Sequence, residues 1–276
     1  MKVALLQLCS GDDPVANLKV TTALIDRAVD EGAGFVLTPE VTNCVSASRA
    51  RQIEVLRPEC EDISLAALRD LAARRGIWLL IGSLALKTDD ADGRFANRSY
   101  LITPSGEIAA RYDKIHMFDV TISYTESYRE SAGYRPGAQA VLADMPCGPL
   151  GMTICYDVRF PHLYRHLAQS GAEVISVPSA FSPVTGAAHW HMLLRARAIE
   201  TGAWILAPAQ AGTHPATVGK PRQTYGHSLA VSPWGEVIAD AGERTGVIHV
   251  DLDRNAVAQA RQRILSLTHN PEFNGP

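Results

Sequence analysis

The chain has 276 residues, of which 46% are hydrophobic and 20% are charged, a composition typical of a globular protein with a large core. Its formal net charge of −3 excludes a global positive field, so neither nucleic acid nor a membrane surface is an expected partner. The apolar runs are too short for a signal-peptide core or a membrane span, and the sequence therefore predicts a cytoplasmic protein.

Short apolar strands alternate with segments of helical period along the chain. Pro14 near the start and Gly32 past the end delimit the first helix, and the turn "TPSGE" predicts a hairpin. The predicted elements are strand 2–8, helix 14–31, strand 34–40, helix 64–75, strands 77–83, 96–104 and 107–114, a strand ending at 155, helix 161–170, strand 172–178, helix 187–202, strand 203–209 and hairpin-like strands around 232–236. Such alternation favours an α/β fold with active residues at strand ends, and the long polar stretch 119–140 is typical of a functional loop.

One internal similarity is more specific than this alternation. "GAGFVLTPE" at 32–40 and "GAEVISVPS" at 171–179 share Gly-Ala, an apolar strand and a proline at the same offset. A fold with two related halves would produce this pattern and would place Glu40 and Ser179 at equivalent strand ends. Chance similarity between two buried strands is the alternative.

The cysteines and histidines do not form a recognisable metal or disulfide pattern. The five cysteines are odd in number and irregularly spaced, and no Cys-x-x-Cys pair is present. His189 and His191 in "AHWH" are two residues apart, which on a helix directs them to different faces. We therefore expect no metal and no cofactor.

Four reactive side chains are candidates for chemistry. Glu40, Lys114 and Cys155 each follow a predicted strand, and Glu130 lies in the polar stretch. Hydrolysis of an amide by a thiol needs a base for the thiol proton, a cation near the oxyanion and a proton for the departing nitrogen. Taken alone, each residue also has a purely structural interpretation, which is core packing for the cysteine and a solvated surface charge for the others.

Together these residues resemble the nitrilase superfamily of carbon–nitrogen hydrolases, and in particular its Nit branch. The resemblance runs from the first strand to about residue 255. The matching motifs are "TPE" at Glu40, "YDKIHMFD" at Lys114, "ESAGYRPG" at Glu130 and "GPLGMTICYDVRFP" at Cys155, followed by "VPSAF", "TGAAHWHMLLRARAIE", "AQAGTH", "YGHS" and "SPWGEV". It implies a four-layer αββα sandwich, a single domain over 1–276 with a polar C-terminal tail at about 266–276, and at least a homodimer.

The resemblance also implies a set of catalytic roles. Cys155 is the expected nucleophile, and Glu40 is the base that accepts its proton. Lys114 and the backbone N–H of Tyr156 are expected to stabilise the oxyanion. Glu130 is expected to orient Lys114 or the substrate.

Tyr156, Ser179, Phe181 and His191 are the expected substrate-binding residues. His191 departs from the family pattern "HWE", which carries glutamate at that position. For "YDVRFP" we expect an ion pair between the aspartate and the arginine that braces the cysteine turn; the alternative is an arginine that binds a substrate carboxylate.

The expected function is hydrolysis of a small carboxylate-bearing amide through a thioester, with release of ammonia. Deaminated glutathione and ω-amides of dicarboxylic acids are the expected substrates. Within the same superfamily, an N-carbamoyl-amine hydrolase or a nitrilase is the alternative. A non-catalytic protein that binds a metabolite is the alternative from another class.

Overall fold

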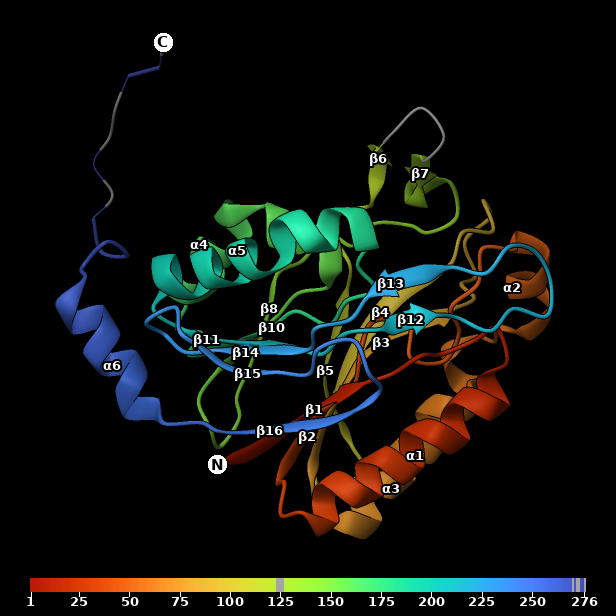
Figure 1. The fold of residues 1–276 in the computed structure, drawn as a ribbon, viewed down its shortest axis with the longest axis horizontal. Coiled ribbons are helices and arrows are strands. Elements are labelled where there is room, and N and C mark those ends of the chain that lie inside the picture. Colours follow the sequence, from red (N-terminus) through yellow and green to blue (C-terminus); the bar gives the residue numbers. More distant parts are fainter. Residues whose placement is uncertain (123–126, 270, 272–273, 276) are drawn as a thin grey trace.

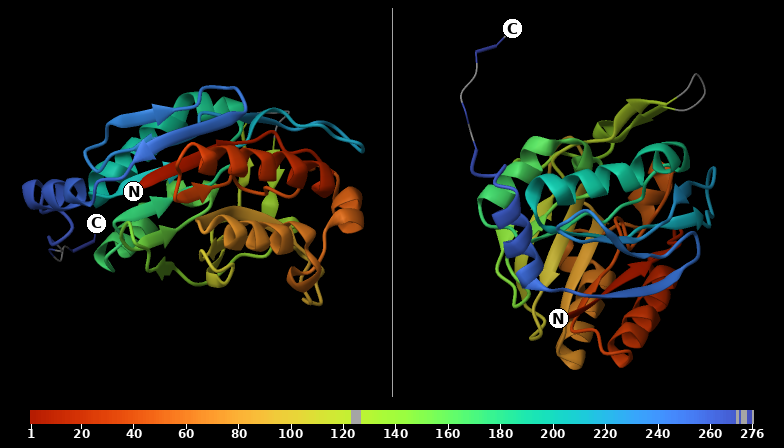
Figure 2. Two further views of the ribbon diagram at one scale, coloured as in Figure 1. Left: turned by 90° about the horizontal axis from the view of Figure 1, so that it is seen from below. Right: turned by 60° about the vertical axis from the view of Figure 1, so that its left-hand side comes forward.

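The computed structural model describes residues 1–276 except 123–126, 270, 272–273 and 276. Two six-stranded sheets lie face to face, and helices cover the outer face of each (Figure 1). Figure 2 shows α1 (Pro14–Asp30) and α3 (Ile63–Arg75) on one side of the sheets and α4 (Pro161–Gln169) and α5 (Pro183–Thr201) on the other. This is the predicted four-layer αββα sandwich.

The two sheets have the same pattern of pairing. Their orders are β16-β1-β2-β3-β4-β5 and β8-β9-β10-β11-β14-β15, and in each the second, third and fourth strands are parallel while the other neighbours are antiparallel. The strands of the first sheet are β16 (Gly246–Asp251), β1 (Lys2–Gln7), β2 (Phe35–Leu37), β3 (Trp78–Leu86), β4 (Ala96–Ile102) and β5 (Ile108–Asp113). Those of the second are β8 (Val141–Ala143), β9 (Leu150–Met152), β10 (Val174–Ser176), β11 (Trp204–Ala207), β14 (Leu229–Val231) and β15 (Val237–Asp240). Because β2 and β10 hold the same position, the predicted relation between the two halves is confirmed.

Side-chain alternation along β1 explains how the layers hold together. Val3 and Leu5 face the second sheet, whereas Ala4 and Leu6 face α1 and α3. All four are fully buried. Strands with both faces buried read as continuous apolar runs, which is why period-2 alternation is not visible in the sequence here.

The helix ends follow ordinary capping chemistry. The Asp13 carboxylate accepts hydrogen bonds from the first N–H groups of α1, and Gly76, with φ of 61°, ends α3. Helix α5 begins at Pro183, four residues before the predicted start, because proline is well suited to a first helical turn. Two helices were not predicted: α2 (Arg49–Val55) and α6 (Arg254–Arg263).

The polar stretch 119–140 has more structure than a loop. It contains the short hairpin β6 (Asp119–Thr121) and β7 (Ser127–Arg129), followed by a 3₁₀ turn at Glu130–Ala132; residues 123–126 lie outside the described part. A second small hairpin consists of β12 (Ala211–Thr213) and β13 (Gln223–Tyr225). No helix among the described residues is long and apolar enough to span a bilayer.

The described start of the C-terminal tail packs on the second half of the molecule. Arg165 on α4 donates to the carbonyls of Ser266 and His269, and Gln169 donates to that of Leu267. The tail is thus anchored at its beginning by α4.

Candidate active site

Four predicted residues meet at one cavity, three of them just after strands of the two large sheets and the fourth, Glu130, just after the small β6-β7 hairpin. Glu40 follows β2, Lys114 follows β5, Cys155 begins a 3₁₀ turn after β9, and Glu130 begins the turn after β7. All four line a cavity of about 530 Å³. The face-to-face packing of the two large sheets brings these side chains together, although they are up to 115 positions apart in the sequence.

Lys114 is a buried cation held between two carboxylates. Its side chain is only 2% exposed, and its Nζ donates to Glu40 Oε1 at 2.8 Å and to both Glu130 oxygens at 2.9 Å. Burial by itself would lower the pKa of Lys114, but the charges of Glu130 and Glu40 raise it well above its ordinary value. The side chain therefore remains a fixed positive charge in the cavity.

Glu40 is an ionised carboxylate whose two oxygens both accept hydrogen bonds from buried groups of the protein. Oε1 accepts from Lys114 and from Asn97 Nδ2 at 2.9 Å, and Oε2 accepts from the Ala180 N–H at 2.8 Å. Burial raises the pKa of this carboxyl, but the Lys114 charge together with hydrogen bonds from Lys114, Cys155 and Asn97 brings it below the ordinary value. Glu40 is therefore in the form that accepts a proton.

Cys155 is held in a strained turn with its thiol beside Glu40. Its φ of 48° lies in the left-handed region, which a residue with a side chain rarely adopts, and its N–H donates to the Pro178 carbonyl at 2.9 Å. Burial and the charge of Glu40 raise the pKa of the Cys155 thiol, and the opposing effect of Lys114 is smaller. The resting pair is thus a neutral thiol next to a carboxylate.

Asp157 braces the cysteine turn. Its buried carboxylate accepts hydrogen bonds from the Ile154 N–H at 2.9 Å, the Tyr112 hydroxyl at 2.6 Å and the His116 N–H at 3.0 Å. These donors come from the turn itself and from the end of β5 and the residues after it. The carboxylate therefore links the nucleophile turn to the strand that carries Lys114.

Asp157→Asn is expected to lower the free energy of unfolding by about 2–3 kcal/mol. The amide NH₂ of asparagine is a donor, and it would face N–H and O–H donors whose hydrogen bonds the carboxylate now accepts. Urea unfolding at neutral pH measures the difference. The exposed Asp251→Asn is the matched control, for which a change within about 0.5 kcal/mol is expected. Equal stability of the two variants would show that the brace contributes nothing.

Two of the predicted substrate-binding residues line the cavity. Tyr156 and Phe181 form part of its wall. The Arg159 guanidinium lies 5.8 Å and 5.3 Å from the centres of these two rings and contacts His189 Nδ1 at 3.3 Å. The expected ion pair between Asp157 and Arg159 is therefore wrong, although the bracing function of Asp157 is present.

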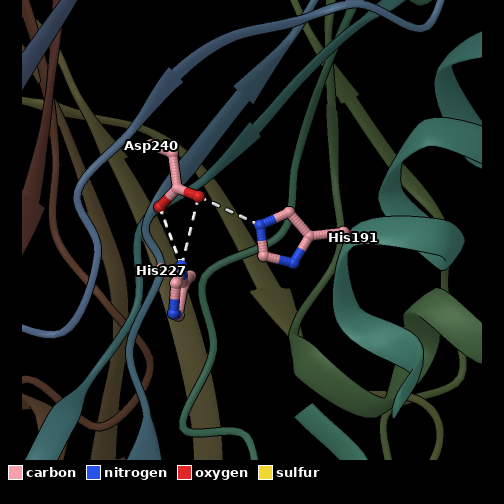
Figure 3. A group of neighbouring side chains, drawn as sticks. All are labelled: His191, His227 and Asp240. Carbon is pink, nitrogen blue, oxygen red and sulfur yellow. Dashed lines mark hydrogen bonds and ion pairs between the residues drawn. The ribbon is translucent and has the colours of Figure 1, made fainter. Parts of the chain in front are cut away.

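The other two predicted substrate-binding residues lie outside the cavity. Ser179 pairs with Ala209 as an extension of the sheet, and its hydroxyl donates to the Val177 carbonyl at 3.0 Å. His191 lies on α5, where its Nε2 is 3.0 Å from Asp240 Oδ2 (Figure 3). Both assignments are corrected: sheet pairing fixes the orientation of the serine, and the helical turn directs the histidine away from the cavity.

Asn97, the second residue of β4, is a site residue that the sequence did not indicate. Its Nδ2 donates to Glu40 Oε1 at 2.9 Å and to Glu130 Oε1 at 3.4 Å, and so connects the two carboxylates. The Phe118 N–H donates to Glu130 Oε2 at 2.6 Å. Nothing in the strand "ANRSYLI" distinguishes this asparagine from a structural one.

The outer wall of the cavity offers polar groups that have no partner among the described residues. Arg222 Nε, Ser182 Oγ and Thr185 Oγ1 are buried without a hydrogen bond. Arg49 and Arg129 also line the cavity. Unpaired buried donors are costly, and a cationic wall therefore suits an anionic ligand that would satisfy them.

Comparison with known proteins agrees with this geometry. A model of the carbon-nitrogen hydrolase family matches residues 2–262. A deaminated glutathione amidase from Yersinia enterocolitica is 42% identical over 270 residues, which cover 97% of this chain and 92% of that protein. The family is the one that the motifs predicted, and the match to its model extends a few residues beyond the predicted end at about residue 255.

Solved structures extend the agreement to the fold. The NitFhit protein of Caenorhabditis elegans has a TM-score of 0.89 at 34% identity; the match covers 98% of this chain but only 64% of the longer NitFhit chain. Nit3 of Saccharomyces cerevisiae, a member of branch 10 of the nitrilase superfamily, has a TM-score of 0.83 at 30% identity and covers 96% of this chain and 94% of its own. Motifs, fold and cavity lead to one conclusion: this chain belongs to the carbon–nitrogen hydrolase family of the nitrilase superfamily.

Proposed function

We propose that this protein is an amidase that hydrolyses a small carboxylate-bearing amide through a thioester on Cys155. The observation that carries the proposal is the buried group of Glu40, Lys114 and Cys155 in one cavity. A base, a cation and a thiol are the parts that acyl transfer from an amide requires. Glu130, bonded to Lys114 and to Asn97, is a positioning residue in this proposal.

In the first half of the reaction, Cys155 Sγ attacks the amide carbonyl while its proton passes to Glu40. The carbonyl oxygen becomes an oxyanion, which the Lys114 ammonium and the Tyr156 N–H stabilise. The C–N bond then breaks, and the proton held by Glu40 passes to the departing amine. The products of this half-reaction are a thioester and a free amine.

In the second half, water opens the thioester. Glu40, which has regained its carboxylate form, accepts a proton from the water as the oxygen attacks the thioester carbonyl. The C–S bond breaks, the Cys155 sulfur takes back the proton, and the carboxylic acid leaves. One base therefore acts twice, and Lys114 faces the oxyanion in both halves.

The raised pKa of the thiol predicts a particular pH profile. The pKa of Glu40 is lowered from its ordinary value by Lys114 and its hydrogen bonds, whereas those of Cys155 and Lys114 are raised by burial and by the neighbouring carboxylates, respectively. The base form of Glu40 is lost only as the pH falls through its lowered pKa, so kcat/KM is expected to be flat between about pH 6 and pH 9. A profile measured with a non-titrating amide tests this. A rise towards an apparent pKa near 8 would instead indicate attack by a preformed thiolate.

The cationic wall supports a substrate that carries a carboxylate. The Yersinia relative is named for deaminated glutathione, which has two carboxylates, and ω-amides of dicarboxylic acids have one. The leaving group distinguishes these substrates: an ω-amide releases ammonia, whereas the amide of deaminated glutathione releases cysteinylglycine. The expected release of ammonia therefore applies to the ω-amides only. We place the substrate carboxylate at Arg222, whose Nε is unpaired.

Arg222→Met is expected to raise KM for the preferred substrate by about 10- to 100-fold with a smaller effect on kcat, because a charge-assisted hydrogen bond is lost. Initial rates over a range of substrate concentrations measure both constants. Lys220→Met, an exposed cation in the same segment, is the matched control. An unchanged KM in the Arg222 variant would place the carboxylate elsewhere.

The substrate panel that tests the proposal contains α-ketoglutaramate, succinamate, deaminated glutathione, an N-carbamoyl amino acid and an aliphatic nitrile. We expect the free acid and its amine from one of the first three, and none from the Cys155→Ala variant. Turnover confined to the ureido compound or to the nitrile would favour the alternatives within the superfamily. Saturable binding without turnover would indicate a metabolite-binding protein.

We also propose at least a homodimer, a cytoplasmic location, and no nucleic-acid or membrane partner. All five cysteines are free, as is usual in a reducing compartment. Met192 and Ile199 on α5 are 66% and 54% exposed, and Trp234, which lies near Ile199, is 43% exposed, which leaves apolar surface suited to a second copy. Sedimentation of the wild type and of Met192→Glu tests the dimer. That residues 1–276 form one domain stays a prediction.

A further inference from the structure

Three potential metal ligands from three separate elements meet at the surface of the second sheet. His191 lies on α5, His227 lies between β13 and β14, and Asp240 ends β15 (Figure 3). His191 Nε2 is 3.0 Å from Asp240 Oδ2, and His227 Nδ1 is 3.0 Å and 3.1 Å from the two Asp240 oxygens. None of the three lines the catalytic cavity.

The distances between the side-chain N and O atoms of His191, His227 and Asp240 are close to the distances between neighbouring ligand atoms around a bound transition metal. A tetrahedral zinc ion with ligands at about 2.0–2.1 Å has neighbouring ligand atoms about 3.3 Å apart. The three ligand atoms of the group all lie within 4.8 Å of one another. Small side-chain rotations would therefore suffice to place one ion between them.

Surrounding contacts hold two of the ligands in place. His227 has a φ of 56°, and its backbone is fixed by bonds from its N–H to Gly242 O at 2.7 Å and from Trp190 Nε1 to its carbonyl at 2.8 Å. The Tyr225 ring stacks on the imidazole with centres 4.5 Å apart. Asp240 Oδ1 accepts from the Gly242 N–H at 2.8 Å. Strained backbone and outer hydrogen bonds of this kind are common around sites with a function.

The donor set selects the class of ion. Two imidazole nitrogens and one carboxylate oxygen suit Zn²⁺ and similar divalent transition metals, whereas Ca²⁺ and Mg²⁺ prefer oxygen ligands. The three side chains are 21–32% exposed, which leaves access for an ion and for water as a fourth ligand. We propose that His191, His227 and Asp240 form a binding site for one Zn²⁺-class ion, which would link α5 to β15 and to the 225–227 turn.

This site differs from what the sequence predicted. The histidine pair "AHWH" gave no expectation of a metal, and His189 indeed faces Arg159 rather than Asp240. The other two ligands lie 36 and 49 positions after His191, distances that no local motif reveals. The proposal rests on the surface cluster alone and is independent of the proposed amidase activity.

Calorimetric titration of chelator-treated full-length protein with Zn²⁺ tests the site. We expect one ion per chain, with affinity reduced by about 10- to 100-fold in His191→Gln and in Asp240→Asn. His189→Gln, which removes a neighbouring histidine on the same helix, and Cys155→Ala, which removes the catalytic thiol, are expected to bind zinc within about twofold of the wild type. Circular dichroism checks that each variant is folded.

Several results would overturn the site. Undiminished zinc affinity in both ligand variants would do so, as would the absence of saturable binding to the wild type. Loss of binding in Cys155→Ala would assign the ion to the catalytic thiol. Anomalous diffraction at the zinc edge from wild-type crystals provides a test that needs no variant: a peak between His191, His227 and Asp240 supports the site, and a peak only elsewhere contradicts it.

Discussion

Cys155→Ala is expected to lower kcat/KM for the amide substrate by about 10⁴-fold or more, because the nucleophile, its base and the oxyanion cation act as a unit. Assay of the acid and amine products gives the ratio. The fold should survive, since the backbone bond from residue 155 to Pro178 does not involve the thiol. The left-handed φ is strained for any residue with a side chain, so alanine adds little further cost.

Cys60→Ala is the matched control for this experiment. Cys60 is an exposed thiol in the 3₁₀ turn Glu59–Glu61, and it does not line the cavity. Wild-type activity is expected for it. Retention of more than about a tenth of the activity in Cys155→Ala would show that the chemistry does not pass through this thiol.

Lys114→Met is the second change with a large expected effect. It removes the cation that faces the oxyanion, for which a loss of about 10²- to 10³-fold in kcat is expected. It also leaves the buried Glu40 and the partly buried Glu130 without a counter-charge, at a cost of about 3–5 kcal/mol in the free energy of unfolding. Kinetics and urea unfolding measure the two effects separately.

The second variant Lys114→Met/Glu130→Gln separates charge balance from catalysis. It removes the charge of the partly buried Glu130, so stability should recover in part while activity does not. In the single variant the pKa of Glu40 should rise, because Lys114 now lowers it. The lost stability should therefore return partly as the pH falls from 7 towards about 5 and the carboxylate takes up a proton. Activity near that of the wild type in either variant would remove Lys114 from the mechanism.

The sequence was sufficient to predict the three reactive side chains that meet in the cavity. Glu40, Lys114 and Cys155 follow apolar strands, and strand ends on one side of a layered fold converge. Their motifs also occur in family order along the chain. The repeated Gly-Ala-strand-proline pattern correctly indicated two related halves, because β2 and β10 hold equivalent positions.

What the sequence did not reveal depends on side-chain direction. Ser179 follows its strand as Glu40 follows β2, but continued pairing with Ala209 fixes its hydroxyl away from the cavity. His191 follows the buried Trp190, and one residue of helical rotation places it at the surface. The sequence around Asn97 is that of an ordinary strand, and only the position of β4 beside Glu40 in the fold identifies this asparagine as a site residue.

The measurement that tests the central claim most directly is the mass of the Cys155 peptide from protein quenched rapidly in acid during turnover of the preferred amide. The mechanism predicts an added mass equal to the acyl part of the substrate, located on Cys155 and absent before substrate is added. It also predicts that hydroxylamine, added before the quench, removes this mass as the hydroxamate. An acyl group on any other side chain, or continued turnover with unmodified Cys155 at every quench time, would contradict the mechanism.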